Sequence, residues 1–550
     1  MSQSSTFEVP VLIVGAGPVG LSMALLLAHH GVPCRVVERR SDGRHRPAAG
    51  LVNARSMEIL RQCGAERHLR GSSLPPEFGR YMLRVETIAG REIARRPAPF
   101  GAGAPQPFSS VAACVSPGGA IQPSLRAAVG ERQEIDLHFR CELVGFVQDD
   151  DGVTATLRER DSGEETRVRA SHLVAADGAR SRVREALGIR MVGHANLAHR
   201  VFITFRADLR PWFADRPPYL CIVQHPEARG GLFTIDGTIN WRFSAHYEPA
   251  RGERSDDFTA ERCVALIRTA VGVPDLPVEI VARDPWSISA HVAERYRDGR
   301  VFLVGDAVHE MPPLGGLGMN TGIHDAHNLA WKLAGVLQGW AGPGLLDTYE
   351  PERLPIGRAT TERALGNVVS AAGVRVPGDE RTPAMPAAGA GSPPPHHNEW
   401  GLIFGASYAS AAVVPDGTPP AAVADPACDY LPSARPGARA PHVWLRRGAT
   451  TISSLDLFGS RFVVLAGPDD RAWCGAAAAL ADRCPLSAYR IGPGGDLSDP
   501  AGDWQATYGV EADGTVLVRP DGHVAWRARS ARSAPEADLR RVLASILAAP

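Results

Sequence analysis

The alternation of apolar and polar segments near the start of the chain predicts a strand, a tight turn, a helix and a second strand. Residues 9–14 form a short apolar run, and the glycine-rich segment GAGPVG occupies 15–20. Residues 21–29 have the length and apolar composition of a buried helix, which Gly31 is placed to end. A second apolar strand then leads to Glu38. This order of elements is typical of the first half of a dinucleotide-binding unit.

The turn at 15–20 has the glycine spacing G-x-G-x-x-G, which suits a bound pyrophosphate. Gly15 permits the tight turn, Gly17 lets the phosphates approach the backbone, and Gly20 allows the helix to pack closely on the strand. Free N–H groups at the helix start would bind the phosphates, and Glu38 would accept hydrogen bonds from the ribose hydroxyls of an adenosine. The expected cofactor-binding residues of this unit are Gly15, Gly17, Pro18, Val19, Gly20, Glu38 and Arg39. This pattern alone leaves NAD and FAD as alternatives.

Two later segments combine a buried strand with a turn of glycine and aspartate. Residues 167–175 are predicted to form a strand that leads to Asp177-Gly178, after which a short helix begins. Residues 300–304 are predicted to form another strand, which leads to Gly305-Asp306. A loop rich in proline and glycine follows, and then a predicted helix over 321–338. One pair of glycine and aspartate usually marks a simple turn. The glycine turn at 15–20 followed by these two segments, in this order, indicates a shared site.

In this order the motifs resemble those of the class A flavoprotein monooxygenases, the para-hydroxybenzoate hydroxylase family. The similarity is greatest to the hydroxylases that tailor aromatic polyketides in actinobacteria, and it extends over nearly the whole chain. Its most specific stretch is GDAVHEMPPLGGLGMNTGIHDAHNLAWKL, at 305–333. The resemblance implies that the first glycine motif binds the ADP half of FAD and that the motif at 305–306 contacts the riboflavin half. FAD rather than NAD is therefore the expected bound cofactor.

The resemblance also implies roles for single residues around the flavin. Asp306 is expected to accept a hydrogen bond from the ribityl chain, and Pro313 to lie beside the ring on the side where oxygen reacts. The N–H groups of Met319 and Asn320 are expected to face N1 and the C2 carbonyl, where a helix N-terminus stabilises negative charge on the reduced ring. The other implied FAD contacts are Arg46 on a mobile-flavin loop, Gln122 and Arg126 near the pyrophosphate and ribityl chain, the Val144 backbone at the adenine, Asp177, Gly305, Gly316 and Gly318.

The expected fold class is α/β with α+β elements. It comprises a Rossmann-like FAD-binding domain, an inserted mixed β-sheet domain that roofs the substrate pocket, and a thioredoxin-like C-terminal domain. The expected boundaries are 1–79, 116–191 and 290–372 for the FAD-binding domain, 80–115 and 192–289 for the substrate sheet, 373–399 for a linker rich in proline, glycine and alanine, and 400–550 for the C-terminal domain. The C-terminal domain has no C-x-x-C pair, since Cys474 and Cys484 are ten residues apart. Dithiol chemistry is therefore not expected there, and the domain is interpreted as scaffold or dimer surface.

The sheet domain offers several side chains that could orient or deprotonate a phenol, and loss of that proton aids attack at an aromatic carbon. The candidates are Tyr219, His225, His246 and Tyr247. A single histidine in a strand is more often structural, and the phenol-binding roles of these four residues rest on position alone. None of them is assigned a catalytic role.

Composition narrows the range of partners. The 550 residues include 59 basic and 60 acidic side chains, a net charge of −1, so the chain has no long-range field for nucleic acid or an anionic membrane. Nine cysteines, an odd number without metal-ligand spacing, indicate reduced thiols in the cytoplasm and no metal site. The uncharged run from Val9 to Cys34 is not expected to span a membrane, because glycines and Pro18 interrupt it. A small aromatic molecule is the expected partner, and a homodimer is an alternative to a monomer.

The activity that the resemblance implies is hydroxylation of an electron-rich aromatic compound, polycyclic and derived from a polyketide. The chain has no second glycine-rich unit, so NADPH or NADH would bind transiently and reduce the flavin. Reduced flavin and molecular oxygen would then form a C4a-hydroperoxide, whose distal oxygen passes to the substrate in a dry pocket. A Baeyer–Villiger monooxygenase and a non-catalytic flavin-binding protein remain alternatives. A flavin-dependent halogenase would carry a W-x-W-x-I-P motif and a lysine in its pocket. That class is excluded, because no two tryptophans are two residues apart and the single lysine, Lys332, lies in the helix after the flavin loop.

Overall fold

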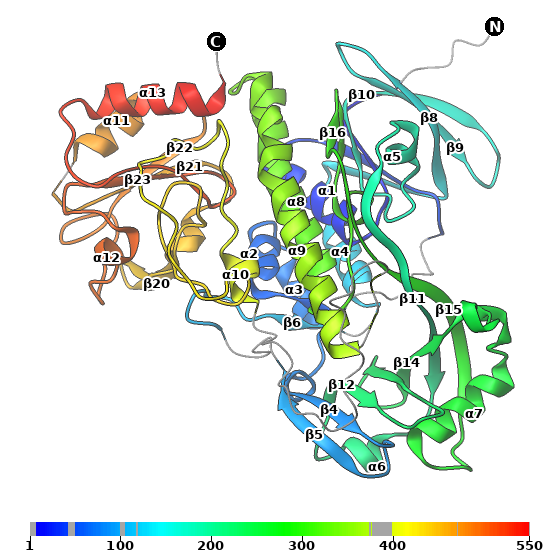
Figure 1. Ribbon diagram of the computed structural model, residues 1–550. Helices are drawn as coiled ribbons and strands as arrows, with labels where there is room; N and C mark the ends of the chain where they lie inside the picture. Colours follow the sequence, from blue (N-terminus) through cyan, green and yellow to red (C-terminus); the bar gives the residue numbers. More distant parts are fainter. Residues whose placement is uncertain are drawn as a thin grey trace, which may run out of the picture.

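Three regions pack together in the computed structural model (Figure 1). A largely parallel sheet with its helices lies in the centre, a second sheet lies at one end of it, and the C-terminal region packs against one side. The structure describes residues 7–41, 50–98, 105–116, 119–372, 374, 376, 399–469 and 471–548. Arg46 and nearly all of the expected linker at 373–399 lie outside these ranges.

The central sheet gathers strands from distant parts of the chain. Its strands are β1 (Phe7–Val14), β2 (Cys34–Glu38), β7 (Ile135–Phe139), β8 (Cys141–Gln148), β9 (Val153–Glu159), β10 (Glu165–Ala175), β16 (Arg297–Asp298) and β17 (Val301–Leu303). The order is β16-β17-β10-β1-β2-β7, and the hairpin of β8 and β9 continues from β10. Strands β17, β10, β1, β2 and β7 are parallel. Their carboxyl ends therefore meet at one edge, where ligands bind in sheets of this type.

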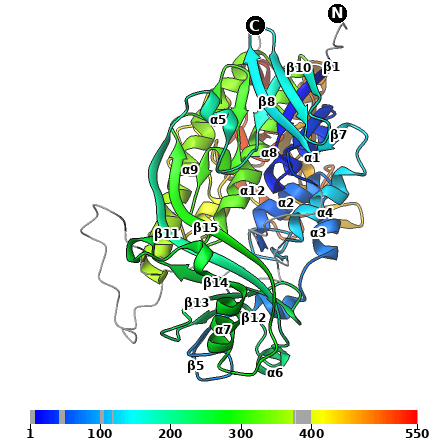
Figure 2. The ribbon, with the colours of Figure 1, turned by 90° about the vertical axis from the view of Figure 1, so that its right-hand side faces the viewer.

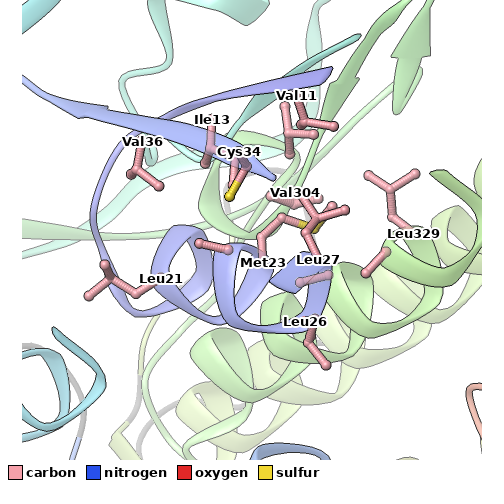
Figure 3. Packing of buried hydrophobic residues seen from close by; sticks show 14 of the residues in the cluster. Val11, Ile13, Leu21, Met23, Leu26, Leu27, Cys34, Val36, Val304 and Leu329 are labelled. Carbon is pink, nitrogen blue, oxygen red and sulfur yellow. The ribbon is translucent and has the colours of Figure 1, made fainter. Parts of the chain in front are cut away.

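Helices packed on this sheet bury its apolar strands. The helices of this region are α1 (Pro18–His29), α2 (Ala54–Gln62), α3 (Glu66–Gly71), α4 (Ile121–Val129), α5 (Arg182–Ala186), α8 (Leu317–Leu337) and α9 (Tyr349–Ala372). Helix α1 is buried from Gly20 to Ala28, which matches its apolar composition on all sides. Its Met23 and Leu27 belong to one core with Ile13 of β1 and Leu329 of α8 (Figure 3). The first turn after β1 thus rests on a rigid base.

The second sheet is mixed and has eight strands. They are β4 (Tyr81–Val85), β5 (Glu92–Pro97), β11 (Met191–Arg206), β12 (Pro218–Val223), β13 (Gly230–Thr234), β14 (Asn240–Tyr247), β15 (Glu279–Ala293) and β18 (His309–Glu310), in the order β18-β15-β11-β14-β13-β12-β4-β5. The long strands β11 and β15 lead from the central region into this sheet (Figure 2). Helices α6 (Arg210–Phe213) and α7 (Ala260–Val271) accompany it, and alternate residues such as Val201 and Ile203 share a core with α7.

The C-terminal region has its own sheet, in the order β22-β21-β23-β24. Its elements are α10 (Trp400–Phe404), β19 (Trp444–Arg447), β20 (Thr450–Ser453), β21 (Phe462–Ala466), α11 (Ala472–Leu480), β22 (Leu486–Arg490), α12 (Trp504–Tyr508), β23 (Thr515–Val518), β24 (Val524–Ala528) and α13 (Pro535–Leu547). A parallel β–α–β unit followed by an antiparallel pair and a helix is the arrangement expected of a thioredoxin-like domain. Trp331 of α8 meets Phe462 edge to face at 5.7 Å, so the two regions share an apolar core.

Short elements complete the fold. Strands β3 (Leu51–Val52) and β6 (Cys114–Val115) form an antiparallel pair. The 3-10 turns are η1 (Pro76–Gly79), η2 (Pro249–Arg251), η3 (Ser255–Asp257), η4 (Gly305–Ala307), η5 (Pro343–Thr348) and η6 (Ser454–Leu457). The α/β fold class expected from the sequence is confirmed.

Candidate active site

The turn after β1 carries glycines at positions where a side chain would collide with the backbone. Gly15 has a φ of 106°, and a Cβ atom there would lie 2.4 Å from the Ala176 carbonyl oxygen. A Cβ atom on Gly20 would lie 2.0 Å from the Gly15 carbonyl oxygen. These close approaches hold the start of α1 against the ends of β1 and β10. No side chain caps α1 at Gly17, so its first N–H groups are available to a phosphate.

Glu38, at the end of β2, points back to this turn. Its Oε2 accepts a hydrogen bond from the Ala16 N–H at 3.1 Å, and its Oε1 accepts one from the Arg40 N–H at 3.0 Å. Gln122 on α4 donates its side-chain amide to the Ala16 carbonyl. Both sides of the turn are therefore held in place. The half-buried carboxylate still has lone pairs for ribose hydroxyls.

A recess at this edge of the sheet joins the first motif to the second. Glu38, Arg39, Leu143 and Asp177 line it together with the glycine turn. Oδ2 of Asp177 accepts a hydrogen bond from the Val183 N–H at 3.3 Å, while its buried Oδ1 has no hydrogen-bond partner in the part of the chain that the structure describes. Burial raises the pKa of this carboxyl. An unpartnered buried acceptor beside an uncapped helix start fits the hydroxyl and phosphate groups of FAD.

Two other expected FAD contacts lie near this recess. The pairing of β8 with β9 shifts register between Leu143 and Gly145, which places Val144 at a β-bulge. A bulged residue is left out of the ladder, so the Val144 backbone is free to contact a base. The guanidinium of Arg126 lies 5.7 Å from the ring of Phe139, which pairs with Glu38 across the neighbouring strands. Arg126 thus lies against β7, the strand that pairs with β2.

The turn after β17 carries the third motif. Gly305 has a φ of 63°, and η4 presents Asp306 at the same edge of the sheet. The Asp306 side chain is exposed on one side, yet the surrounding protein raises the pKa of its carboxyl through desolvation. Pro313, in the following loop, is also exposed.

The start of α8 completes this end of the site. Gly316, with a φ of 66°, precedes the helix, and no side chain caps it. Oδ1 of Asn320 accepts a hydrogen bond from the Asn53 N–H at 3.0 Å, and its Nδ2 donates to the Leu51 carbonyl at 3.0 Å. The Asn320 side chain therefore ties α8 to β3, which the sequence did not indicate. The N–H groups of the first helical turn, including that of Met319, have no partner within the helix and remain available to a ligand.

Sequence reasoning missed three charged residues that support these motifs. Arg184 on α5 donates to the carbonyls of Ala179 and Ala307, so it links the second motif to the third. Asp325 and Arg353 form a fully buried ion pair at 2.8 Å behind the Gly305 turn. A carboxylate inside the apolar helix α8 was the available signal for Asp325, because a buried charge requires a partner. The sequence did not indicate which residue that partner was.

Of the four candidates for binding a phenol, Tyr219 lies next to the flavin loop. A Cβ atom on Gly50 would lie 3.7 Å from the Tyr219 hydroxyl, and Tyr219 packs against Leu51, whose side chain in turn borders Gly316. Burial raises the pKa of Tyr219 to about 12. Its hydroxyl therefore stays protonated and can donate a hydrogen bond.

The other three candidates are placed differently. Tyr247 packs in the core on the α7 side of the sheet, with its ring 6.0 Å from that of Phe258. Nδ1 of His225 accepts a hydrogen bond from the Glu227 N–H at 3.3 Å, a local turn contact. His246 has an exposed side chain. The contacts of Tyr247 and His225 do not support a role at the flavin, whereas His246 lies on the face of the sheet turned away from α7.

Two negative findings concern the described ranges only. Within them, no group of three or more His, Cys, Asp or Glu side chains could hold a metal ion. No helix in the same ranges is long and apolar enough to cross a membrane.

Comparison with known proteins agrees with this geometry. The chain matches two family models, the FAD binding domain over residues 8–364 and the C-terminal domain of aromatic-ring hydroxylases over 433–550. A putative polyketide hydroxylase of Streptomyces halstedii is 41% identical, over 98% of this chain and 97% of its own.

Two solved structures are similar over their full length. The flavin-dependent monooxygenase PieE, in complex with FAD and substrate, has a TM-score of 0.88 at 36% identity, covering 99% of this chain and 100% of that chain. Aklavinone-11 hydroxylase, in a ternary complex with FAD and aklavinone, has a TM-score of 0.87 at 36% identity with the same coverage. The three FAD motifs lie at one edge of the central sheet, and family models match both the N-terminal and the C-terminal part of the chain. The chain therefore belongs to the FAD-dependent aromatic-ring hydroxylases.

Proposed function

We propose that the protein hydroxylates an electron-rich, polycyclic aromatic compound derived from a polyketide, using NAD(P)H and molecular oxygen. It is an FAD-dependent monooxygenase of the aromatic-hydroxylase family. The proposal rests on one observation above all, the direct connection of the flavin turn to the second sheet. Strand β18, which follows η4 in the chain, pairs with β15 of that sheet. A substrate held on the sheet would therefore lie beside the flavin.

FAD supplies the redox chemistry, accepting a hydride and activating oxygen for transfer to carbon. The chain's own residues would bind and orient it. Glu38 would hold the adenosine ribose, the N-terminus of α1 the pyrophosphate, and Asp306 the ribityl chain. The N-terminus of α8 would stabilise negative charge that develops on the ring.

The second sheet would hold the substrate on the face turned away from α7. On that face Phe202 and Trp286 stack with their ring centroids 4.8 Å apart. Trp286 also packs in one apolar cluster with Leu314, the residue after Pro313 in the flavin loop. Flat aromatic walls suit a planar polycyclic ring and exclude water from the site.

Tyr219 would also contact a substrate oxygen. Tyr219 keeps its proton because burial raises its pKa to about 12, so it would donate a hydrogen bond rather than act as a base. The names of the relatives, polyketide hydroxylase and aklavinone-11 hydroxylase, support a polycyclic polyketide as the substrate class.

The remaining parts of the proposal concern the reductant, the C-terminal domain and the cell compartment. NADPH or NADH would bind transiently, and we place the enzyme in the cytoplasm as a monomer or homodimer. Burial raises the pKa of the Cys484 thiol to about 11, which leaves little thiolate and supports a scaffold role for the C-terminal domain. We propose the same four-part division as in the sequence analysis, with the linker at 373–399.

Product analysis under labelled oxygen tests the proposal. The holoenzyme would be incubated with NADPH, ¹⁸O₂ and a series of polycyclic phenols, and products would be examined by mass spectrometry and ¹³C NMR. We expect one labelled oxygen in a new aromatic C–OH group, and none when the label is in water. An ester or lactone that carries the label in its single-bonded oxygen would instead indicate Baeyer–Villiger insertion. NADPH consumption that yields only hydrogen peroxide with every phenol would contradict the proposal.

A further inference from the structure

The turn that carries Asp306 is held from behind by one buried carboxylate. Oδ2 of Asp325, on α8, accepts hydrogen bonds from the Gly305 N–H at 3.1 Å and from Nε2 of His309 at 2.7 Å. These two donors lie on either side of Asp306 in the chain. Asp325 and His309 are completely buried. The conformation of the turn therefore depends on the position of this one carboxylate.

The other oxygen of the same carboxylate leads towards the C-terminal domain. Nε of Arg353, on α9, donates to Oδ1 of Asp325 at 2.8 Å, and its Nη2 donates to the Thr321 carbonyl at 3.2 Å. Its Nη1 donates to the hydroxyl of Tyr408 at 3.2 Å. Arg353 is completely buried, so all of these contacts are shielded from water.

Tyr408 belongs to the C-terminal domain and is itself firmly held. Its ring stacks on that of His523 with the centroids 4.1 Å apart, and its N–H donates to the Gly437 carbonyl at 2.9 Å. The guanidinium of Arg519 lies 5.3 Å from the same ring. The Tyr408 hydroxyl is thus a fixed point on the domain surface that faces α9.

Stability alone does not explain a buried chain of this kind. Removing two charges from water costs several kcal/mol per ion, and apolar residues of similar volume are often equally stable in such positions. A buried ionic network whose charged atoms are hydrogen-bonded, as those of Asp325 and Arg353 are, instead fixes one geometry. What this network fixes is the turn at Gly305, which lies at the cofactor edge of the central sheet.

We propose that Asp325 and Arg353 are positioning residues for the flavin, through which the hydroxyl of Tyr408 in the C-terminal domain fixes the turn that carries Asp306. The inference rests on the proposed contact of Asp306 with FAD. It gives the C-terminal domain a part in cofactor binding, through Arg353 and Asp325.

Ser410 provides a matched control for Tyr408. It is also a hydroxyl of the C-terminal domain, and its Oγ donates at 2.6 Å to Glu352, the neighbour of Arg353 on α9. Glu352 pairs with Lys332 and Arg519 rather than with the flavin turn. Tyr408→Phe and Ser410→Ala thus each remove one hydroxyl from the same interface, but only the first interrupts the path to Asp306.

The experiment is titration of each apoprotein with FAD, followed by visible circular dichroism and the reduction potential at full FAD occupancy. We expect Tyr408→Phe to weaken FAD binding about three- to tenfold and to alter both signals, and Ser410→Ala to stay within about twofold of wild type. Arg353→Met should weaken binding more than Tyr408→Phe does, and Arg353→Lys should restore part of the loss because it keeps the charge. Thermal unfolding of the apoproteins measures the purely structural effect, which should be similar for Tyr408→Phe and Ser410→Ala.

Asp306→Asn separates this inference from the assumption beneath it. Loss of FAD affinity in Asp306→Asn, with Tyr408→Phe and Arg353→Lys unchanged in affinity, dichroism and potential, would overturn the inference and leave the Asp306 contact standing. Unchanged FAD affinity in Asp306→Asn would overturn the contact and the inference with it. Tyr408→Phe carries the test by itself if Arg353→Met does not fold.

Discussion

Replacing Glu38 with glutamine should weaken FAD binding although the side chain keeps its size. The two carboxylate oxygens already accept hydrogen bonds from the N–H groups of Ala16 and Arg40. An amide has only one acceptor oxygen, so its NH₂ group must face one of these two donors. It also lacks the negative charge that a ribose hydroxyl would meet. Losing one charge-assisted hydrogen bond corresponds to about 1–3 kcal/mol, or roughly a 5- to 150-fold rise in Kd.

Titration of the apoprotein by flavin fluorescence would measure this effect. FMN serves as the control ligand because it lacks the adenosine ribose that Glu38 would bind, and its weaker affinity should be the same in both proteins. A Glu38→Gln protein that binds FAD as tightly as wild type would refute the assignment of Glu38 to the ribose. An equal loss for FMN and FAD would show that the substitution damages the turn as a whole.

Three further predictions concern thiols, flavin reduction and acid stability. Replacing Cys474 and Cys484 by serine should leave NADPH-dependent turnover unchanged, since no thiol pair exchanges electrons; lost turnover with full FAD occupancy would restore a redox role. A productive phenol should accelerate anaerobic flavin reduction in stopped flow, and Arg46→Ala should lose much of that acceleration while keeping FAD; equal rates with and without phenol would argue against control by substrate. Although burial opposes it, Arg353 and His309 lower the pKa of Asp325 from 3.8 to about 2. The lowered pKa stabilises the folded protein by about 2 kcal/mol above pH 4, and this contribution disappears as the pH falls towards 2. Between these pH values the free energy of unfolding in urea should therefore change less for Asp325→Asn than for wild type.

The local elements of the FAD-binding region were predictable because their signals are local. The first strand, turn and helix follow one another directly, so apolar runs and glycine spacing were sufficient to find them. The helix starts were less accurate. Helix α1 begins at Pro18 rather than at 21, because proline is favoured at the first helical position, and α8 begins at Leu317 rather than at 321.

The supporting contacts could not be predicted, because they join residues that are far apart in the chain. The Asn320 side chain accepts a hydrogen bond from the Asn53 N–H, 267 positions earlier in the chain, and no pattern within a single segment indicates such a pair. The same applies to Arg353, whose role depends on how α8 and α9 pack. Among the aromatic candidates, Tyr219 and Tyr247 looked alike in sequence. Only the pairing of the strands showed that Tyr247 points into the core beside α7.

The strand order of the central sheet also determines when the site can form during synthesis. Strand β1 pairs with β2, which emerges soon after it, and with β10, which ends at Ala175. Until β10 emerges from the ribosome, β1 presents an unpaired edge that could join another chain. The riboflavin end comes later still, since Asp306 follows every strand of the second sheet except β18, and α8 follows β18 as well. A nascent chain thus completes its cofactor site only after the substrate sheet has been synthesised, and every shorter fragment lacks half of that site.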